Sequence, residues 1–284
     1  MIAERIGTPE EFLAKTLEFR ESEPAQTNLI GSVALAVSQG IQVYTHYYWW
    51  IVRSGEKVVG CGMHTAPQGF GLSPMTDEAA QVLGTAVAES DEIPFPSIHG
   101  PFAPSIAFKD AYCKTKGSYG TKVSTRTMLL YEIETLKKPV NVQGSFRLCT
   151  LDDLPLVVEW SKQFFIDAEL HETVDHEQRN RDKIKEGMEY FWEKDGVPVA
   201  WGGHAVPVAS GNKLVARIGP IYTPKQYRKN GYGSAITAEI TEILQNRVAK
   251  VMLFADAGNP HSNAIYQAIG YQLTCDVAEI RFVE

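Results

Sequence analysis

A short loop with two glycines joins a strand-like run to a helical pattern in the second half of the chain. The run that contains Ile221 stops at Pro224, and Gly231 and Gly233 follow. Residues 234–246 then carry isoleucine and leucine at helical spacing. Glycines can adopt a positive φ and lack a Cβ atom, so successive backbone N–H groups can converge on a phosphate at the start of the helix. The pattern predicts an anion-binding loop that leads into a helix.

Two common phosphate-binding loops do not fit these residues. The P-loop of nucleotide triphosphatases needs Gly-Lys-Ser/Thr at its end, but here the second glycine is followed by Ser234 and Ala235. The dinucleotide-binding fingerprint needs a third Gly or Ala where this chain has Ile236. The positive charges of Arg228 and Lys229 still favour an anion at this place.

A second motif follows at residues 259–271, directly after the apolar run 251–255. Within it, Asn259 can cap a short helix, Pro260 suits the first helical position, and Gly270 can end the helix. The spacing therefore predicts a strand, a capped helix and a glycine stop in that order.

Taken together, the two motifs resemble the acyl-CoA pyrophosphate loop and the Asn-x-x-(Ser/Ala)-x-x-x-Tyr-x-x-x-Gly-(Phe/Tyr) signature of the GNAT superfamily of N-acyltransferases. The resemblance covers residues 145–284 and includes Tyr266, one helical turn before the closing glycine. It implies an α/β fold with a twisted mixed sheet flanked by helices. It also implies acetyl-CoA as co-substrate and an amine, either small or on a peptide, as acceptor.

The resemblance gives each motif residue an expected role. The strand before the loop would splay from its neighbour and offer backbone groups to the pantetheine arm, and Pro224 would end its pairing. Tyr266 would protonate the departing thiolate, since a phenol has an ordinary pKa of about 10; packing a helix on the sheet is the alternative role. The residues expected to bind acetyl-CoA are Ile221, Tyr222, Thr223, Arg228, Lys229, Asn230, Gly231, Tyr232, Gly233, Ser234, Asn259 and Ser262.

The general base and the acceptor site are not identified by the sequence. His204 has a suitable unperturbed pKa, although an ordinary hydrogen-bonded role is the alternative. Glu169, Glu172 and Asp175 lie where the family's acceptor-lining helices are expected, and they form either an amine-attracting cluster or a solvated acidic face.

Neither a metal site nor a disulfide is expected. His171 and His176 are five residues apart, with Asp175 where a zinc protease needs its second histidine. No Gly-x-Ser-x-Gly motif supports a serine hydrolase. The cysteines are widely spaced and are expected to be reduced: Cys61, Cys113, Cys149 and Cys275.

Composition predicts a soluble, cytoplasmic protein of two domains. The chain has 284 residues, of which 44% are hydrophobic and 21% charged. Its net charge of −7 argues against a nucleic-acid partner, because phosphate backbones require a basic face, and is compatible with cationic amines. The start of the chain lacks a signal-peptide pattern, and the longest apolar stretch, residues 29–37, is too short for a bilayer.

Features of the second half recur in the first at an offset of about 142 residues, which indicates a duplication, with coincidence as the alternative. Thr8 and Thr150 each begin a capping-box pattern, and an aromatic strand followed by a glycine turn comes later in both halves. The first half lacks the glycine loop and has Asp77 and Glu78 in the equivalent place, where they would repel a pyrophosphate. We therefore expect a degenerate GNAT-like domain over 1–136, a linker over 137–145 and a catalytic GNAT domain over 146–284.

The sequence thus predicts an N-acetyltransferase with a cofactor-free N-terminal copy that helps to wall the acceptor cleft. Tyr47, Tyr48 and Trp49 could supply that wall, with core packing as the alternative. The second hypothesis is a regulatory module that binds CoA without turnover. The identity of the acceptor and the oligomeric state are not determined.

Overall fold

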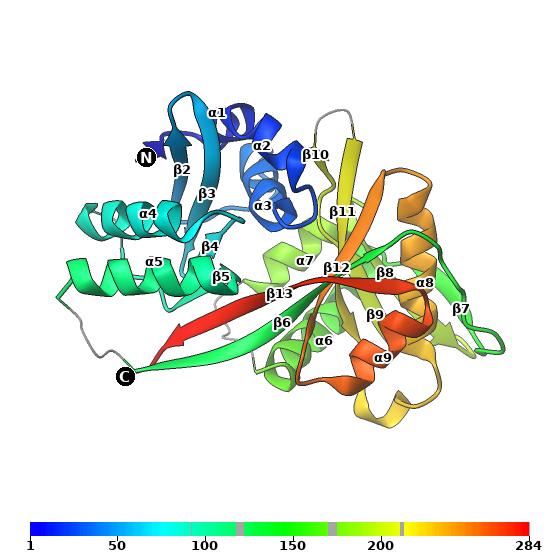
Figure 1. The fold of residues 1–284 in the computed structure, drawn as a ribbon. Coiled ribbons are helices and arrows are strands. Elements are labelled where there is room, and N and C mark those ends of the chain that lie inside the picture. The colour runs from blue at the N-terminus through cyan, green and yellow to red at the C-terminus, as the bar shows by residue number, and fades with distance from the viewer. Residues whose placement is uncertain (92, 118–121, 170–174, 211–212, 284) are drawn as a thin grey trace.

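A computed structural model of the chain describes residues 1–91, 93–117, 122–169, 175–210 and 213–283 (Figure 1). In the first half, strands and helices alternate around one part of a large sheet. The elements are β1 (Ile2–Ile6), α1 (Pro9–Lys15), α2 (Leu17–Ser22), α3 (Asn28–Ser38), β2 (His46–Ser54), β3 (Lys57–Ala66), β4 (Phe70–Leu72), α4 (Asp77–Glu89), β5 (Ser97–Pro101), α5 (Phe102–Thr115) and β6 (Val123–Ile133).

The second half follows nearly the same order of elements. It contains β7 (Ser145–Leu148), a 3-10 turn (Leu151–Asp153), α6 (Leu154–Asp167), α7 (His176–Lys185), β8 (Glu189–Lys194), β9 (Val197–His204), β10 (Val208–Ser210), β11 (Lys213–Tyr222), a second 3-10 turn (Lys225–Tyr227), α8 (Tyr232–Gln245), β12 (Lys250–Asp256), α9 (Pro260–Ala268) and β13 (Tyr271–Phe282). Each half includes an antiparallel hairpin, and each has one parallel pair, β4–β5 or β11–β12.

The described strands form one mixed sheet in which the two halves exchange strands. Its order is β1-β2-β3-β4-β5-β13-β6-β12-β11-β9-β8-β7, with β10 paired to β11. The last strand of the first half, β6, lies between β12 and β13, and β13 continues the pairing to β5. Figure 1 shows β6 and β13 running side by side from one half to the other. The halves therefore share a continuous hydrogen-bonded sheet.

Helices cover both faces of this sheet. In the second half, α8 packs on one face with an apolar row that includes Ile236, Ile240 and Leu244. On the other face, α6 packs Val157 and Trp160 over the sheet. In the first half, α4 and α5 lie on one face, and α1 and α3 contribute to a separate core on the other. The expected fold class, a mixed sheet flanked by helices, is confirmed.

Short-range signals in the sequence account for where several elements begin. The side chain of Thr8 accepts a hydrogen bond of 3.2 Å from the backbone N of Glu11 at the start of α1. Thr150 and Asp153 form a reciprocal capping box before α6. Both predicted caps are confirmed, and so are the two hairpins, whose turns contain glycines with positive φ.

The aromatic residues of β2 belong mostly to cores. Tyr48 and Trp49 are buried in different clusters, because successive side chains of a strand point to opposite faces. Only Tyr47 is exposed, at 40%. Core packing, rather than a cleft wall, is thus the role of Tyr48 and Trp49.

The exchanged strands generate a testable prediction at Leu130. This residue of β6 is fully buried in a small cluster with Ala25, Val215 and Met252, which come from both halves. Leu130→Ala removes apolar contacts and leaves a cavity, so we expect the free energy of unfolding to fall by about 2–5 kcal/mol. Urea unfolding followed by fluorescence and circular dichroism measures this loss.

Leu273→Ala on the neighbouring strand β13 is the matched control, because that side chain is 53% exposed. It should change stability by less than about 0.5 kcal/mol. Equal effects of the two substitutions would contradict the placement of β6 at the centre of the sheet.

Candidate functional site

The glycine loop ends at the N-terminus of α8, as predicted. Gly231 is the residue before the helix and has φ of +81°, in the left-handed region that glycine tolerates best. Lys229 also has a positive φ, +67°. Gly233 differs from the prediction, because it lies inside the first turn of α8 with no positive φ. Its lack of a side chain instead leaves open space beside Thr223, whose Oγ1 would lie 3.4 Å from an added Cβ.

A row of backbone N–H groups is free at this helix start. The first backbone hydrogen bond into α8 runs from Ala235 N to Gly231 O, at 2.9 Å. Within the described part of the chain, the N–H groups of residues 229–234 donate to no protein acceptor. The helix has 14 residues, so its dipole adds partial positive charge at the same end. The loop is therefore a suitable binding site for a phosphate group.

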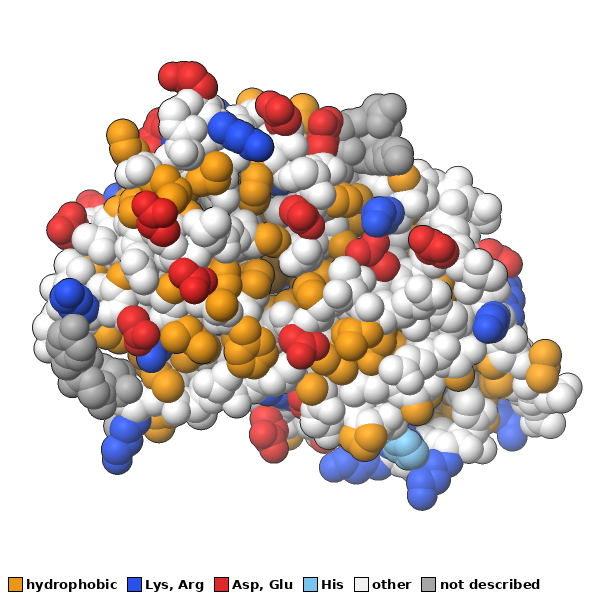
Figure 2. Space-filling view, viewed as in Figure 1, with side chains coloured by type: hydrophobic (Ala, Val, Ile, Leu, Met, Phe, Trp, Pro, Cys, Tyr) orange, Lys and Arg blue, Asp and Glu red, His pale blue; other side chains and the backbone are white. Residues whose placement is uncertain are grey.

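The basic side chains near the loop are exposed, but one of them is already paired. Arg228 donates to Thr223 O at 2.9 Å and to Asp167 Oδ2 at 2.7 Å. Burial would raise the pKa of Asp167, but hydrogen bonds from Gln163 and Arg228 outweigh it and lower the pKa. Lys229 is exposed and has no ion pair within the described residues. Figure 2 shows Lys and Arg side chains gathered on the lower right of the visible face, where Figure 1 places α9.

The strand before the loop separates from its neighbour. β11 pairs in parallel with β12 only from Val215 to Ile218. The register of β11 against β9 then shifts between Ile218 and Ile221, and Gly219 in this interval has φ of +140°. Ile221 and Tyr222 continue to pair with β9 but have left β12. Their main chain therefore faces a gap in the sheet ladder, as the resemblance implied.

The second motif forms the capped helix α9, which lies against β12 and β13. Asn259 Oδ1 accepts a hydrogen bond of 3.1 Å from Ser262 N, which confirms the predicted cap. Gly270 follows the helix with φ of +109°. The side-chain oxygen of Asn259 is used by the helix itself, so its part at this site is to fix α9 in position.

Tyr266 lies on α9 and packs against the core of the second half, next to residues of β6 and β13. It is partly buried, and its ring centroid lies 6.3 Å from that of Tyr131 and 6.1 Å from that of Tyr271. Its hydroxyl forms no hydrogen bond to the described residues. Burial raises the pKa of Tyr266 to about 12. The phenol therefore stays protonated near neutral pH and can act as a hydrogen-bond donor.

His204 and Asp175, two of the candidate general bases, already make hydrogen bonds within the fold. His204 is buried, its Nδ1 lies 2.9 Å from Ala205 O, and burial lowers its pKa to about 4. Asp175 caps α7 by accepting from Gln178 N at 3.0 Å. Glu169 has φ of +52° at the end of the segment after α6. His171 and Glu172 lie outside the described residues.

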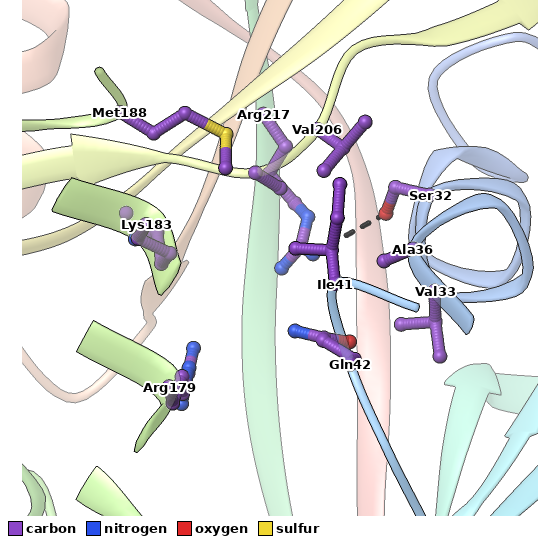
Figure 3. A pocket seen from close by; sticks show the side chains of 12 residues that line it. Ser32, Val33, Ala36, Ile41, Gln42, Arg179, Lys183, Met188, Val206 and Arg217 are labelled. Carbon is purple, nitrogen blue, oxygen red and sulfur yellow. Dashed lines mark hydrogen bonds between the residues drawn. The ribbon is translucent and has the colours of Figure 1, made fainter. Parts of the chain in front are cut away.

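Sequence reasoning missed a cavity between the two halves, which we call the interface cavity. It has a volume of about 50 Å³ and lies between α3 on one side and α7 and β11 on the other (Figure 3). Three basic side chains line it, namely Arg179, Lys183 and Arg217. The only signal for this cavity in the sequence was Arg217, which lies inside the apolar strand before the glycine loop. Its role can be inferred only when the residues around it in space are known.

Two further features of the described residues bear on the class of site. No three His, Cys, Asp or Glu side chains among them come together as metal ligands. None of the helices that they form combines the length and apolar character needed to cross a bilayer.

Comparison with known proteins finds a family model that matches most of the second half. Residues 154–271 match the sequence model described as the acetyltransferase (GNAT) family. A search of curated protein sequences finds no match to this chain. The second half therefore contains a GNAT acetyltransferase domain, and the chain is an acyltransferase enzyme.

Similar solved structures extend over the whole chain. A Drosophila protein has a TM-score of 0.70 and 13% identity, covering 99% of this chain and 98% of its own. A GNAT-family acetyltransferase from Colwellia psychrerythraea has a TM-score of 0.61 and 10% identity, covering 100% of both chains. A tandem GNAT protein from the clavulanic acid biosynthesis pathway has a TM-score of 0.55 and 11% identity, covering 99% and 98%. At these identities the likeness shows the fold alone.

The burial of His204 predicts an acid-sensitive contribution to stability. In the unfolded chain an imidazole has a pKa of about 6.5, whereas in the folded protein His204 has a pKa of about 4. The unfolded state then binds more protons between these values, so stability is retained above pH 6.5 and falls as the pH drops toward 4.

We expect the stability advantage of the wild type over His204→Gln to shrink by about 2 kcal/mol between pH 7 and pH 4.5. Urea unfolding at the two pH values measures it. An NMR titration that places the imidazole near its ordinary pKa would contradict the burial of this ring.

Proposed function

We propose that the chain transfers the acetyl group of acetyl-CoA to an amine. The observation that carries this proposal is the row of free N–H groups at the start of α8, inside the segment that matches the GNAT family. A diphosphate needs several hydrogen-bond donors and positive potential in one place, and this helix start supplies both. Acetyl-CoA supplies an activated acyl thioester.

The separated strands support a binding path for the rest of acetyl-CoA. The main chain of Ile221 and Tyr222 has no partner on β12, so it is available to an extended amide-bearing arm. Thr223 comes next, beside the first turn of α8. The residues assigned to acetyl-CoA remain those of the loop and strand, with Asn259 and Ser262 acting through the position of α9.

Tyr266 is the proposed proton donor. A phenol that stays protonated can hydrogen-bond to a departing sulfur and transfer its proton from Oη as negative charge develops there. Burial alone accounts for the raised pKa of Tyr266, and no charged group stabilises its phenolate form.

We propose that the first half is a copy of the same fold that lacks the acetyl-CoA site. In α4, which has the position of α8 in the order of elements, Thr76 Oγ1 accepts from Ala79 N at 3.2 Å. Asp77 and Glu78 occupy the first turn. The helix start that is free in α8 is thus capped and negatively charged in α4, which disfavours a diphosphate. The boundaries proposed for the copies are 1–136 and 146–284, although β6 pairs across them.

Substitution of Gly231 tests the acetyl-CoA site. Gly231→Ala puts a side chain at a positive φ and about 3.0 Å from Val142 Cγ2, so the loop must shift. We expect the affinity for acetyl-CoA to fall about tenfold or more, measured by titration calorimetry. Gly196→Ala is the matched control, since it has φ of +75° in open space on another turn. It should leave the affinity unchanged.

Substitution of Tyr266 tests the proton-donor role. Tyr266→Phe should lower kcat at least tenfold with little change in acetyl-CoA affinity, because general acids contribute about 10²-fold or more. CoA release over a panel of amines provides the rate. Tyr271→Phe is the control, because it removes a 2.8 Å hydrogen bond to Thr241 and should lower stability without the same loss of kcat. Acetyl-CoA binding with no CoA release for any amine would instead support the regulatory module.

A further inference from the structure

The interface cavity is built from both halves of the chain. Ser32 of α3 and Gln42 of the loop after it face the cavity from the first half (Figure 3). Arg179 and Lys183, one turn apart on α7, face it from the second half, together with Arg217 of β11. Figure 3 shows the Arg217 side chain reaching into the space between α3 and α7.

The cavity has an excess of positive charge. Lys183 is buried and paired with the buried carboxylate of Glu189. Arg179 has no ion pair within the described residues. Arg217 Nε is buried without a hydrogen-bond partner there, and its Nη2 reaches only Ser32 Oγ, at 3.4 Å. Glu189 carries one negative charge against three basic side chains, and Arg179 also acts on that carboxylate, so the cavity keeps an excess of positive charge.

The positive charges in the cavity destabilise the folded state unless an anion binds beside them. Buried charges in proteins are normally paired, and an uncompensated one destabilises the folded state. Burial lowers the pKa of Arg217 to about 10, and the positive charge of Arg179 acts in the same direction. At neutral pH the guanidinium remains charged, so its buried donors are available to an anion.

The position and size of the cavity suit part of an acceptor. Gly219 lines it, and β11 separates from β12 directly before Gly219, after Ile218. The cavity therefore lies next to the gap where the resemblance implies the pantetheine arm of acetyl-CoA. A volume of about 50 Å³ exceeds the 10–15 Å³ that one water needs, and accommodates a group as small as a carboxylate.

We propose that the acceptor is an amine that also carries a carboxylate, which Arg217 and Arg179 bind in the interface cavity. A planar guanidinium presents paired donors that match the two oxygens of a carboxylate. This inference rests on the proposed acetyl transfer and specifies its substrate class. It also gives the first half a part in the acceptor site, through Ser32 and Gln42.

Matched acceptors test the proposal. CoA release is measured with free amino acids, the corresponding amino acid amides, and the amines that lack the carboxyl group. The wild type should favour the carboxylate-bearing member of each set by at least tenfold in kcat/KM. Arg217→Gln and Arg179→Gln should remove this preference through a higher KM, by about tenfold or more, because a charge-assisted hydrogen bond is lost. Arg217→Lys should restore part of it.

Arg181→Gln is the matched control on the same helix. Arg181 pairs with Glu177 on the exposed side of α7 and does not line the cavity. It should keep the preference for carboxylates, and all variants should keep the affinity for acetyl-CoA. Efficient transfer to amides or simple amines without preference would overturn the proposal and leave acetyl transfer intact. A preference for phosphate-bearing amines would overturn the carboxylate assignment.

Binding provides a readout that does not depend on turnover. In protein saturated with CoA, calorimetric titration with the same acids and amides should show saturable binding of an acid that Arg217→Gln abolishes. Absence of any such binding would overturn the proposal. Failure of CoA itself to bind would instead reject the proposed function.

Discussion

The exchange of β6 and β13 is the interaction on which the rest of this structure depends. β6 supplies hydrogen bonds to β12 on one side and to β13 on the other, and β13 continues to β5. The two halves are consequently held by a ladder of main-chain bonds, and not only by side-chain contacts. This fixes α3 of the first half against α7 and β11 of the second, and a cavity shared by both halves can persist there.

Two helix starts within one chain show how a small change in sequence controls anion binding. In α8, Gly231 supplies a left-handed turn and leaves the following N–H groups free. In α4, Thr76 satisfies a donor, and acidic residues occupy the first turn. Both helices begin after a strand that has a parallel neighbour. The backbone plan is shared, whereas the capacity to hold a phosphate depends on the residues of one turn.

Separation of β11 from β12 links the two sites that we propose. On one side of the gap, the free N–H groups of α8 suit a diphosphate. On the other, Arg217 projects into the interface cavity from the last stretch of β11 that still pairs with β12. Both sites are rich in donors and positive charge, although the chain as a whole carries a net charge of −7. Local arrangement, and not net charge, decides which ligands these sites attract.

The sequence by itself determined the features that depend on neighbouring residues. The caps at Thr8, Thr150 and Asn259, the turn at Gly231 and the helix after it all involve groups within a few positions, so their patterns were visible. The conformation expected for Gly233 was wrong, because α8 begins at Tyr232, two residues before the start of the helical pattern at Ser234.

Only the tertiary structure decided the strand exchange, the burial of His204 and the interface cavity. Arg217 and Ser32 are 185 positions apart, and nothing in either local pattern brings them together. Such contacts arise from packing of the whole sheet, in which each strand's neighbours are set by long-range pairing and shared cores.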